Sequence, residues 1–568
     1  MDVKTCFEAL PNEIWLCIFQ FIKTNNLGAI FYGLNSRCNA LVIQRMRKYG
    51  YDFRSISKLG FESACHALRS DAAHVRKLCL SDDDETPFQT QVFLAKGFTF
   101  QQFISLTHLS LFGVRSKQTW TALMNAFSHL TNLTRLKLID GSIDYDQSDG
   151  NAILSTIWRL PKLAYADLDI YSDSFMRLLG GINTHSSTLR FVKLHRSICR
   201  LDALQTFFRY TRQLKNLVLH TDSMSSYSLS TVMPSLTSLT LDVYCNDMIG
   251  NILSKTPNLC NLKVEVSQCV YGYQWERLIR VHLPELQTFH MKMTFTWTNG
   301  HYNKYFKELF TSFTGDFWLK QRRWYVRFHC DQQNHNCINC YTLPYAFSEY
   351  HIVQGCCRGS TCPNENDYWS YDSVETLSYN DTFLEQTSQN QSLIQFPNVR
   401  DLHVLVGKDP VLCSIVPQLE KLESLLLFRV KSETLVETLL AQTSQLHSLT
   451  LDTYGPLFAL AGRSIRRLEL RNLFHHNSEE QIRYIIESQH ISNCEILIIH
   501  LRQIENIQPF LQKLPNLRAL AIGHIGGLVA GGDVSKDSRV DLLRSYLPST
   551  AIVERDTKYG GYIRAWIR

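Results

Sequence analysis

The chain has 568 residues, of which 45% are hydrophobic and 19% are charged, and this composition excludes large-scale disorder. Its 58 basic and 52 acidic side chains leave a net charge of +6, which is small for this length and gives no reason to expect a nucleic-acid partner. The sequence has no apolar run long enough to span a membrane and no secretory signal, and its 17 cysteines favour reduced thiols and a cytoplasmic or nuclear location.

The first predicted element is a helix near the start of the sequence. Pro11 stands where the first turn of a helix tolerates proline, and Glu13 follows where the helix dipole favours a carboxylate. Between Ile14 and Ile22 the only polar residue is Gln20, so this helix is apolar on every side and has to be covered on every side. A segment of about 40 residues is too small to bury such a surface alone. We therefore expect a second domain or a second protein to cover part of it, with a plain buried core helix as the alternative.

A leucine-proline pair, an acidic residue and a run of hydrophobic positions follow one another here. They are Leu10, Pro11, Glu13, Ile14, Ile18, Phe19, Ile22, Leu27, Leu34, Arg37 and Leu41. This pattern resembles the F-box over residues 7–50, although residues 35–39 read Asn-Ser-Arg-Cys-Asn where a Cys-Lys-Arg-Trp-like string is common in that family. The resemblance implies a three-helix hook that docks on the Skp-type adaptor of a cullin-RING (SCF) ubiquitin ligase. It also implies that the adaptor is contacted by Leu10, Pro11, Ile14, Trp15, Ile18, Phe19, Ile22, Leu27 and Leu34.

A linker is predicted between this F-box-like domain (1–50) and the rest of the chain. Residues 51–74 include a helical pattern over 61–68, which we expect to dock the hook on the next domain. The basic residues around this junction could contact an acidic partner or nucleic acid, but a solvated helix face is the commoner arrangement. They are Arg45, Arg47, Lys48 and Arg54.

From residue 75 onward one pattern recurs fifteen times: an apolar residue, two residues, an apolar residue, one residue, an apolar residue. Outside one interruption the middle positions are 19 to 31 residues apart. This period and this strand-like core indicate leucine-rich repeats. The middle positions are Leu78, Leu109, Leu136, Ala166, Val192, Leu217, Leu239, Leu262, Phe289, Leu402, Leu425, Leu449, Leu468, Leu497 and Leu520.

The repeats predict an α/β fold for residues 75–568. Proline often precedes the strand, as at Pro161, Pro234 and Pro284, where it ends a helix and sends the chain into an extended conformation. Each unit is therefore helix, turn and strand, and neighbouring units stack to bury their apolar faces. We expect an irregular solenoid with a parallel sheet on its concave side and helices on its convex side.

The interruption at about 294–395 predicts one or two repeats that carry a long ordered insertion. Within it, Trp324, Val326 and Phe328 alternate like the inward residues of a strand. Arg323, Tyr325 and Arg327 would then face outward on the concave side, which makes them candidates for binding an acidic partner. The same basic and aromatic run also has the composition of a nucleic-acid surface, although the strand interpretation is favoured.

Cysteines gather in the same insertion. Cys337 and Cys340 have the spacing of half a tetrahedral zinc site, and Cys357 with Cys362, or Cys356, could supply the other half. Because the second pair is irregularly spaced, free thiols are favoured over structural zinc, and no cofactor is expected.

The segment at about 523–568 predicts a C-terminal cap. A glycine-rich loop is followed by a helical stretch over 535–546 and by a strand pair near 551–553 and 562–566. A terminal repeat needs such a cap, and the loop lacks the Gly-Lys-Ser/Thr of a phosphate-binding loop.

Three functions fit these features. The first is the non-catalytic substrate-recognition subunit of an SCF-type cullin-RING ubiquitin ligase, with the adaptor on the hook and a protein substrate on the repeats. The second is a protein-interaction scaffold in which the hook only caps the first repeat, and the third is an RNA-binding solenoid that uses the basic insertion. An enzyme is least favoured, because the sequence contains no nucleophile elbow, His-Glu-x-x-His helix or Walker loop.

Overall fold

A computed structural model describes most of the chain, and by its contacts this part divides into two compact units. Unit 1 holds Met1–Val218, Arg518–Leu520 and Leu543–Arg568, and unit 2 holds Leu219–Leu517 and Ala521–Leu542. The described residues are 10–22, 24–142, 147–171, 179, 181–195, 201–221, 229–243, 246–296, 302–331, 337–352, 357–363, 371–380, 394–405, 412–430, 433–452, 465–471, 493–501, 503–523, 538–556 and 562–567.

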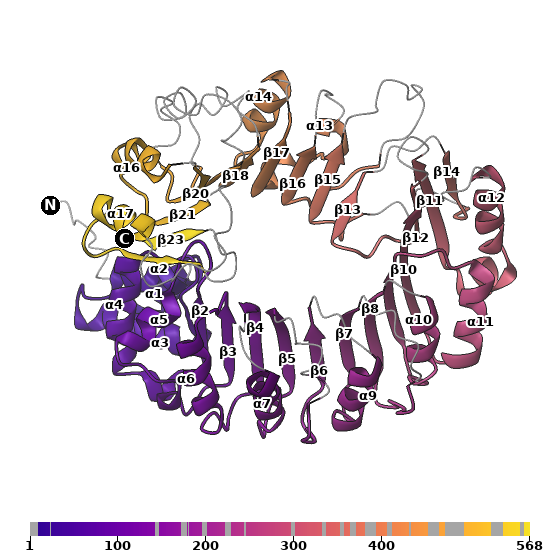
Figure 1. The fold of residues 1–568 in the computed structure, drawn as a ribbon, viewed down its shortest axis with the longest axis horizontal. Coiled ribbons are helices and arrows are strands. Elements are labelled where there is room, and N and C mark those ends of the chain that lie inside the picture. The colour runs from indigo at the N-terminus through magenta and orange to yellow at the C-terminus, as the bar shows by residue number, and fades with distance from the viewer. Residues whose placement is uncertain are drawn as a thin grey trace. The chain divides into compact units, whose positions relative to one another are not determined.

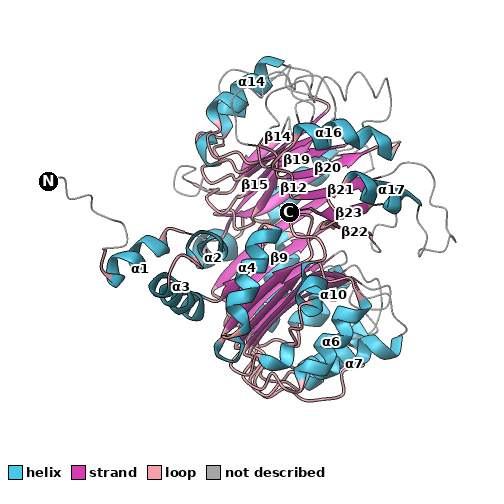
Figure 2. Ribbon diagram, turned by 90° about the vertical axis from the view of Figure 1, so that its left-hand side faces the viewer, coloured by secondary structure: helices cyan, strands magenta, loops and turns pink. Residues whose placement is uncertain are grey.

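Unit 1 begins with three short helices, α1 (Asn12–Gln20), α2 (Thr24–Phe31) and α3 (Ser36–Tyr49), which we call the hook. In Figure 2, α1 lies beside α3, and α2 lies against α4 (Lys58–Arg69). The contact of α2 with α4 is close, because a Cβ atom at Gly28 would lie 3.6 Å from Cβ of Ala64 in α4. The segment 51–74 therefore contributes more than a linker: α4 supports the hook, and β1 (Tyr51–Asp52) joins the sheet beside β2.

The sheet of unit 1 consists of parallel strands in the order β1-β2-β3-β4-β5-β6. Helices that follow the strands cover one face of it (Figure 1). The middle positions of the repeat pattern form one in-register row, from Leu78 through Leu109, Leu136 and Ala166 to Val192. The elements are β2 (Lys77–Ser81), β3 (His108–Phe112), β4 (Arg135–Ser142), β5 (Tyr165–Tyr171), β6 (Phe191–Leu194), helices α5 (Gln89–Ala95), α6 (Lys117–Phe127), α7 (Gln147–Trp158) and α9 (Leu201–Tyr210), and 3-10 turns at Ala72–His74 and Phe100–Gln102.

Unit 2 holds two sheets. In the first, the parallel repeat strands β8, β9 and β10 are extended by β12, β11 and β14, which pair antiparallel. Much of the expected insertion is therefore an antiparallel continuation of the sheet. These elements are β8 (Ser238–Val243), β9 (Asn261–Val266), β10 (Thr288–Thr296), β11 (Tyr325–Asp331), β12 (Cys337–Leu343), β14 (Cys357–Ser360), α10 (Asn246–Leu253), α11 (Gly272–His282), α12 (Tyr302–Ser312) and a π-helix at Phe317–Arg322.

The second sheet of unit 2 is parallel from β13 to β20. Leu377, which lies in the segment where the sequence analysis expected one or two further repeats, pairs in register with Leu402. The elements are β13 (Glu349–His351), β15 (Thr376–Asn380), β16 (Asp401–Leu405), β17 (Ser424–Phe428), β18 (Ser448–Leu451), β19 (Arg467–Leu470), β20 (Ile496–His500), α13 (Leu412–Ile415), α14 (Glu433–Gln442), α16 (Gln508–Lys513) and 3-10 turns at Leu419–Lys421 and Ile504–Ile507.

The unit boundaries fall inside β7 (Asn216–Thr221), β21 (Ala519–Gly523) and α17 (Ser538–Tyr546). With these strands counted, the middle and last apolar residues of each of the fifteen repeat motifs lie on a strand, and each middle residue is at most 2% exposed. The parallel, leucine-rich-repeat-like α/β arrangement predicted from the sequence is therefore confirmed.

The C-terminal strands β22 (Ile552–Arg555) and β23 (Ile563–Trp566) form an antiparallel hairpin in unit 1. The hairpin packs on the N-terminal part of that unit, where Trp566 contacts Phe61 of α4 at a ring-centroid distance of 5.4 Å. The Lys58 ammonium donates to the carbonyl oxygen of Thr550. The first and last parts of the chain therefore share one core.

Candidate functional site

The inward side of α1 gives the hook a small aromatic core. Trp15 and Phe19, four residues apart, are 2% and 0% exposed. Their rings contact Phe31 of α2 at centroid distances of 5.4 and 5.1 Å. Leu27 is also fully buried. The hook therefore hides part of the apolar surface that the sequence assigned to a partner.

The opposite side of α1 stays open. Pro11, Ile14, Ile18 and Phe21 are three or four residues apart and so share one helix face, which we call the outer stripe. Ile14 is 45% exposed and Phe21 is 91% exposed, while Pro11 is exposed and Ile18 half-buried. Such exposure of a phenylalanine in line with other apolar residues is typical of an interaction surface.

These exposures divide the nine residues predicted to bind an adaptor. Trp15, Phe19 and Leu27 form the interior of the hook, so we reassign them from adaptor contacts to core. Pro11, Ile14 and Leu34 are exposed, and Leu10, Ile18 and Ile22 are half-buried.

Two strongly exposed apolar residues were missing from that prediction, Phe21 and Ile30. Ile30 is 52% exposed. The spacing of Phe21, seven residues after Ile14, was the available signal, because it places the two side chains on the same face.

The residues that replace the usual F-box string have structural partners. The Asn35 side chain accepts a hydrogen bond from the backbone N–H of Cys38 at 2.8 Å and so caps α3. Arg37 donates to Oδ1 of Asn12 at 2.8 Å and to the backbone oxygen of Leu10. Arg37 thereby ties the start of α3 to the start of α1 and fixes where the outer stripe begins.

The basic residues at the end of α3 and in the segment that follows it are partnered as well. Arg47 forms an ion pair with Asp71, and Arg54 pairs with Asp52 at 2.6 Å. The Arg45 guanidinium lies 3.3 Å from the centroid of the Tyr49 ring. These contacts fit the interpretation of a structured helix surface better than that of a free nucleic-acid surface.

The candidate partner-binding residues in the insertion are placed differently from the prediction. Val326 and Phe328 are buried as expected, but Tyr325 and Arg327 are also buried, at 8% and 4% exposure. A second layer covers their face, where Arg327 donates to the Tyr371 hydroxyl at 3.3 Å. Of the three candidates only Arg323, which has a positive φ of 55° after the π-helix, is exposed.

The cysteine pair predicted as half a zinc site lies on one regular strand. Cys337 and Cys340 are three residues apart in β12, and an odd separation places side chains on opposite faces of a strand. Cys340 is fully buried, and burial raises the pKa of its thiol, while Cys337 is half-buried and Cys362 is buried. Within the described residues no three metal-ligating side chains come together. The side chain of Cys357, and Cys356 as a whole, lie outside those residues.

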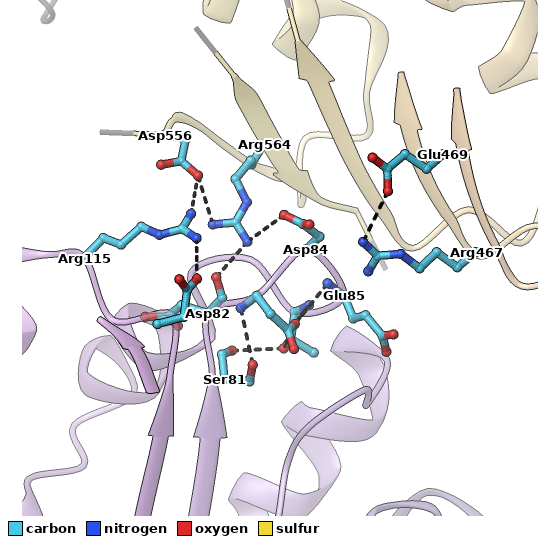
Figure 3. Close-up of polar contacts among 12 residues, drawn as sticks. Ser81, Asp82, Asp84, Glu85, Arg115, Arg467, Glu469, Asp556 and Arg564 are labelled. Carbon is cyan, nitrogen blue, oxygen red and sulfur yellow. Dashed lines mark hydrogen bonds and ion pairs between the residues drawn. The ribbon is translucent and has the colours of Figure 1, made fainter. Parts of the chain in front are cut away.

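A buried charge cluster joins the C-terminal hairpin to the first repeats of unit 1 (Figure 3). Arg564, 2% exposed, donates to the backbone oxygen of Asp82 at 2.7 Å and forms ion pairs with Asp84 at 3.4 Å and Asp556 at 3.5 Å. Arg115 pairs with the same Asp556. Burial raises the pKa of the Asp82 carboxyl to about 7, although the backbone N–H of Thr90 donates a hydrogen bond to it at 2.6 Å. A cavity of about 330 Å³ adjoins the cluster.

Comparison with known proteins finds distant structural likenesses only. No family model and no curated protein match the chain. A leucine-rich-repeat protein of Leptospira interrogans is similar at 12% identity over 80% of this chain and 98% of that chain, with a TM-score of 0.23. The assignment of the fold rests on the strand rows. The F-box resemblance of residues 7–50 has no support from these comparisons.

No helix among the described residues has the length and apolarity needed to cross a membrane.

Proposed function

We propose that this chain is a protein-interaction scaffold of the leucine-rich-repeat type, which holds a partner protein through the outer stripe of α1. One observation carries the proposal: the hook already has a core of its own, yet it leaves Phe21 91% exposed in line with Ile14. An end cap would turn these side chains inward.

Burial of the outer stripe by a partner would supply free energy for binding. Fully burying a phenylalanine or isoleucine side chain contributes roughly 1.5–3 kcal/mol, and a few central anchors supply most of the affinity of an interface. Because the aromatic core and the Arg37 contacts hold α1 in place, little ordering opposes binding.

A second candidate is the substrate-recognition subunit of an SCF-type ligase, in which the partner on the outer stripe is the Skp-type adaptor. It is favoured by a specific coincidence: Pro11, Ile14 and Leu34, which match F-box positions, are exposed. In this interpretation the chain catalyses nothing itself. The recruited cullin-RING core would perform ubiquitin transfer, and the repeats would position a substrate.

Site-specific photocrosslinking in cells tests the scaffold proposal. Full-length protein carrying p-benzoylphenylalanine at Phe21 should give a discrete crosslinked protein, and Ile14→Asp in the same chain should abolish it. Ile104 is the matched control position, because it is an exposed apolar residue of unit 1 (58%) outside the hook. The same crosslinks from both positions would overturn the proposal.

Purified adaptor decides between the two candidates. Calorimetry of full-length protein with a Skp-type adaptor should show binding that Ile14→Asp with Phe21→Asp removes and Ile104→Asp leaves intact. No binding to the adaptor, together with a crosslink to another protein at position 21, would favour the scaffold alone.

A further inference from the structure

Side chains on the open face of the unit 1 sheet line up across neighbouring strands. In this parallel register Lys77 neighbours His108, then Arg135, Tyr165 and Phe191. The residue that follows each of them along its strand is a buried middle position of the repeat pattern, and successive side chains of a strand point to opposite faces, so this row lies on the face away from the repeat core.

A second row runs beside the first. It passes from Ser110 through Lys137 and Asp167 to Lys193. Together the two rows carry four basic side chains, Lys77, Arg135, Lys137 and Lys193, and one carboxylate. Among the described residues, no ion pair joins Lys77, Arg135 or Lys193 to an acidic side chain. We call these two rows the basic strip.

An aromatic platform lies within the basic strip. The rings of Tyr165 and Phe191 stack at a centroid distance of 4.4 Å with an interplanar angle of 7°. The guanidinium of Arg135 and the ammonium of Lys137 lie 5.5 and 5.8 Å from the Tyr165 centroid. A side chain that packs on this platform would therefore be flanked by cations.

The charge of the strip affects one of its own residues, His108. Burial and then the charges of Arg135 and Lys77 lower the pKa of His108, which is what a region of positive potential does to a cationic acid.

The only carboxylate of the strip, Asp167, already has ion-pair and hydrogen-bond partners. Asp167, 5% exposed, pairs with His195 at 2.8 Å and with Lys137 at 3.9 Å, and the Tyr165 hydroxyl donates to it at 3.3 Å. Burial acts to raise its pKa, but His195, Lys193 and Lys137 together lower it. An ionised acceptor therefore lies among the cations.

From this arrangement we propose that the basic strip binds an extended acidic peptide segment of a protein partner, with one aromatic or large apolar residue on the Tyr165–Phe191 platform. Cations about two strand spacings apart, near 10 Å, suit separated carboxylates of a peptide. The ionised Asp167 would repel a continuous phosphodiester backbone but can accept an N–H from a peptide. This inference rests on the proposed function as a protein-interaction scaffold and names the chemistry of a second contact.

The test uses full-length protein and fluorescence anisotropy with a labelled twelve-residue peptide of alternating Glu and Tyr. We expect binding that weakens as salt rises, and a Gln-for-Glu peptide should bind at least tenfold more weakly. Arg135→Glu with Lys137→Glu should also weaken binding at least tenfold. The control, Lys421→Glu with Lys513→Glu, reverses two charges on unit 2 and should stay within twofold.

Three results would overturn the proposal: no binding of the acidic peptide, an equal loss in the control variant, or tighter binding of a twelve-nucleotide single-stranded RNA that the same strip variant removes. Circular dichroism melts verify that each variant is folded, and the single variant Lys77→Glu repeats the test at the edge of the strip. Ile14→Asp should leave peptide affinity unchanged, so failure of the strip and failure of the hook are separate outcomes.

Discussion

The buried guanidinium of Arg564 predicts how firmly the C-terminal hairpin is held. Replacement of Arg564 by leucine removes its hydrogen bond to the backbone oxygen of Asp82 and its ion pairs with Asp84 and Asp556. Removing one partner of a buried ion pair typically costs about 3–5 kcal/mol. Arg115 still neutralises Asp556, which lowers the expected loss to about 2–4 kcal/mol.

Hydrogen exchange followed by mass spectrometry measures this loss locally. The reporters are backbone amides at the hairpin that donate hydrogen bonds within unit 1. The N–H of Asp556 donates to the backbone oxygen of Tyr562 at 2.8 Å, and the N–H of Ile567 donates to that of Arg518 at 2.7 Å. A loss of about 2–4 kcal/mol corresponds to exchange roughly 30- to 1,000-fold faster.

A surface ion pair provides the control. Arg280→Leu breaks a pair with Glu276, four residues earlier on α11, with side chains 49% and 31% exposed. Such a pair contributes about 0.3–0.5 kcal/mol, so the hairpin amides should not change. If Arg564→Leu speeds exchange of the hairpin less than threefold, or speeds the whole chain equally, the reasoning is refuted.

Three further changes have defined outcomes. Trp15→Ala should destabilise the hook by about 3–5 kcal/mol, seen as faster hydrogen exchange in α1 with little change in unit 2. Because burial raises the pKa of Asp82 to about 7, above its unfolded value near 4, the folded state binds the extra proton and wild-type stability falls as pH rises from about 4 to 7. Asp82→Asn should lack that slope, so urea unfolding at pH 5 and 8 should show the stability of the variant relative to wild type growing by about 2.5–3 kcal/mol over this interval. Gly272→Ala would place a Cβ atom 2.2 Å from the backbone oxygen of Ser312, and we expect a lower Tm from a loss of about 1–3 kcal/mol.

The repeat strands could be predicted because their signal is local. In each motif the apolar spacing fixes which side chains turn inward, and the register of rows such as Leu402, Leu425 and Leu449 follows from stacking equal units. The same local rule correctly placed Val326 and Phe328 inside.

The rule could not show whether the other face of a strand is covered. Arg327 is buried because Tyr371, 44 residues later, packs over it. A zinc half-site was suggested by the spacing of Cys337 and Cys340, but a regular strand separates the two thiols onto opposite faces. Similarly, the composition of α1 showed that it was apolar all round, whereas its division into a core side and an outer stripe depends on where Phe31 lies.

Contacts between residues far apart in the sequence could not be predicted from a sequence pattern either. Arg564 meets Asp82 across 482 positions, and Lys58 meets Thr550 across 492. No local sequence pattern around Arg564 or Lys58 identifies a partner so far away in the sequence.

Unit 1 is built from residues 1–218, 518–520 and 543–568, and the residues of unit 2 are encoded between 218 and 543. A ribosome therefore releases the opening repeats long before it makes the hairpin that covers Phe61. During that interval the nascent chain exposes the apolar surface around Phe61, which the hairpin buries later. We therefore expect a chaperone to protect this surface during synthesis. Loss of the hairpin by truncation would destabilise the N-terminal part of unit 1 as well.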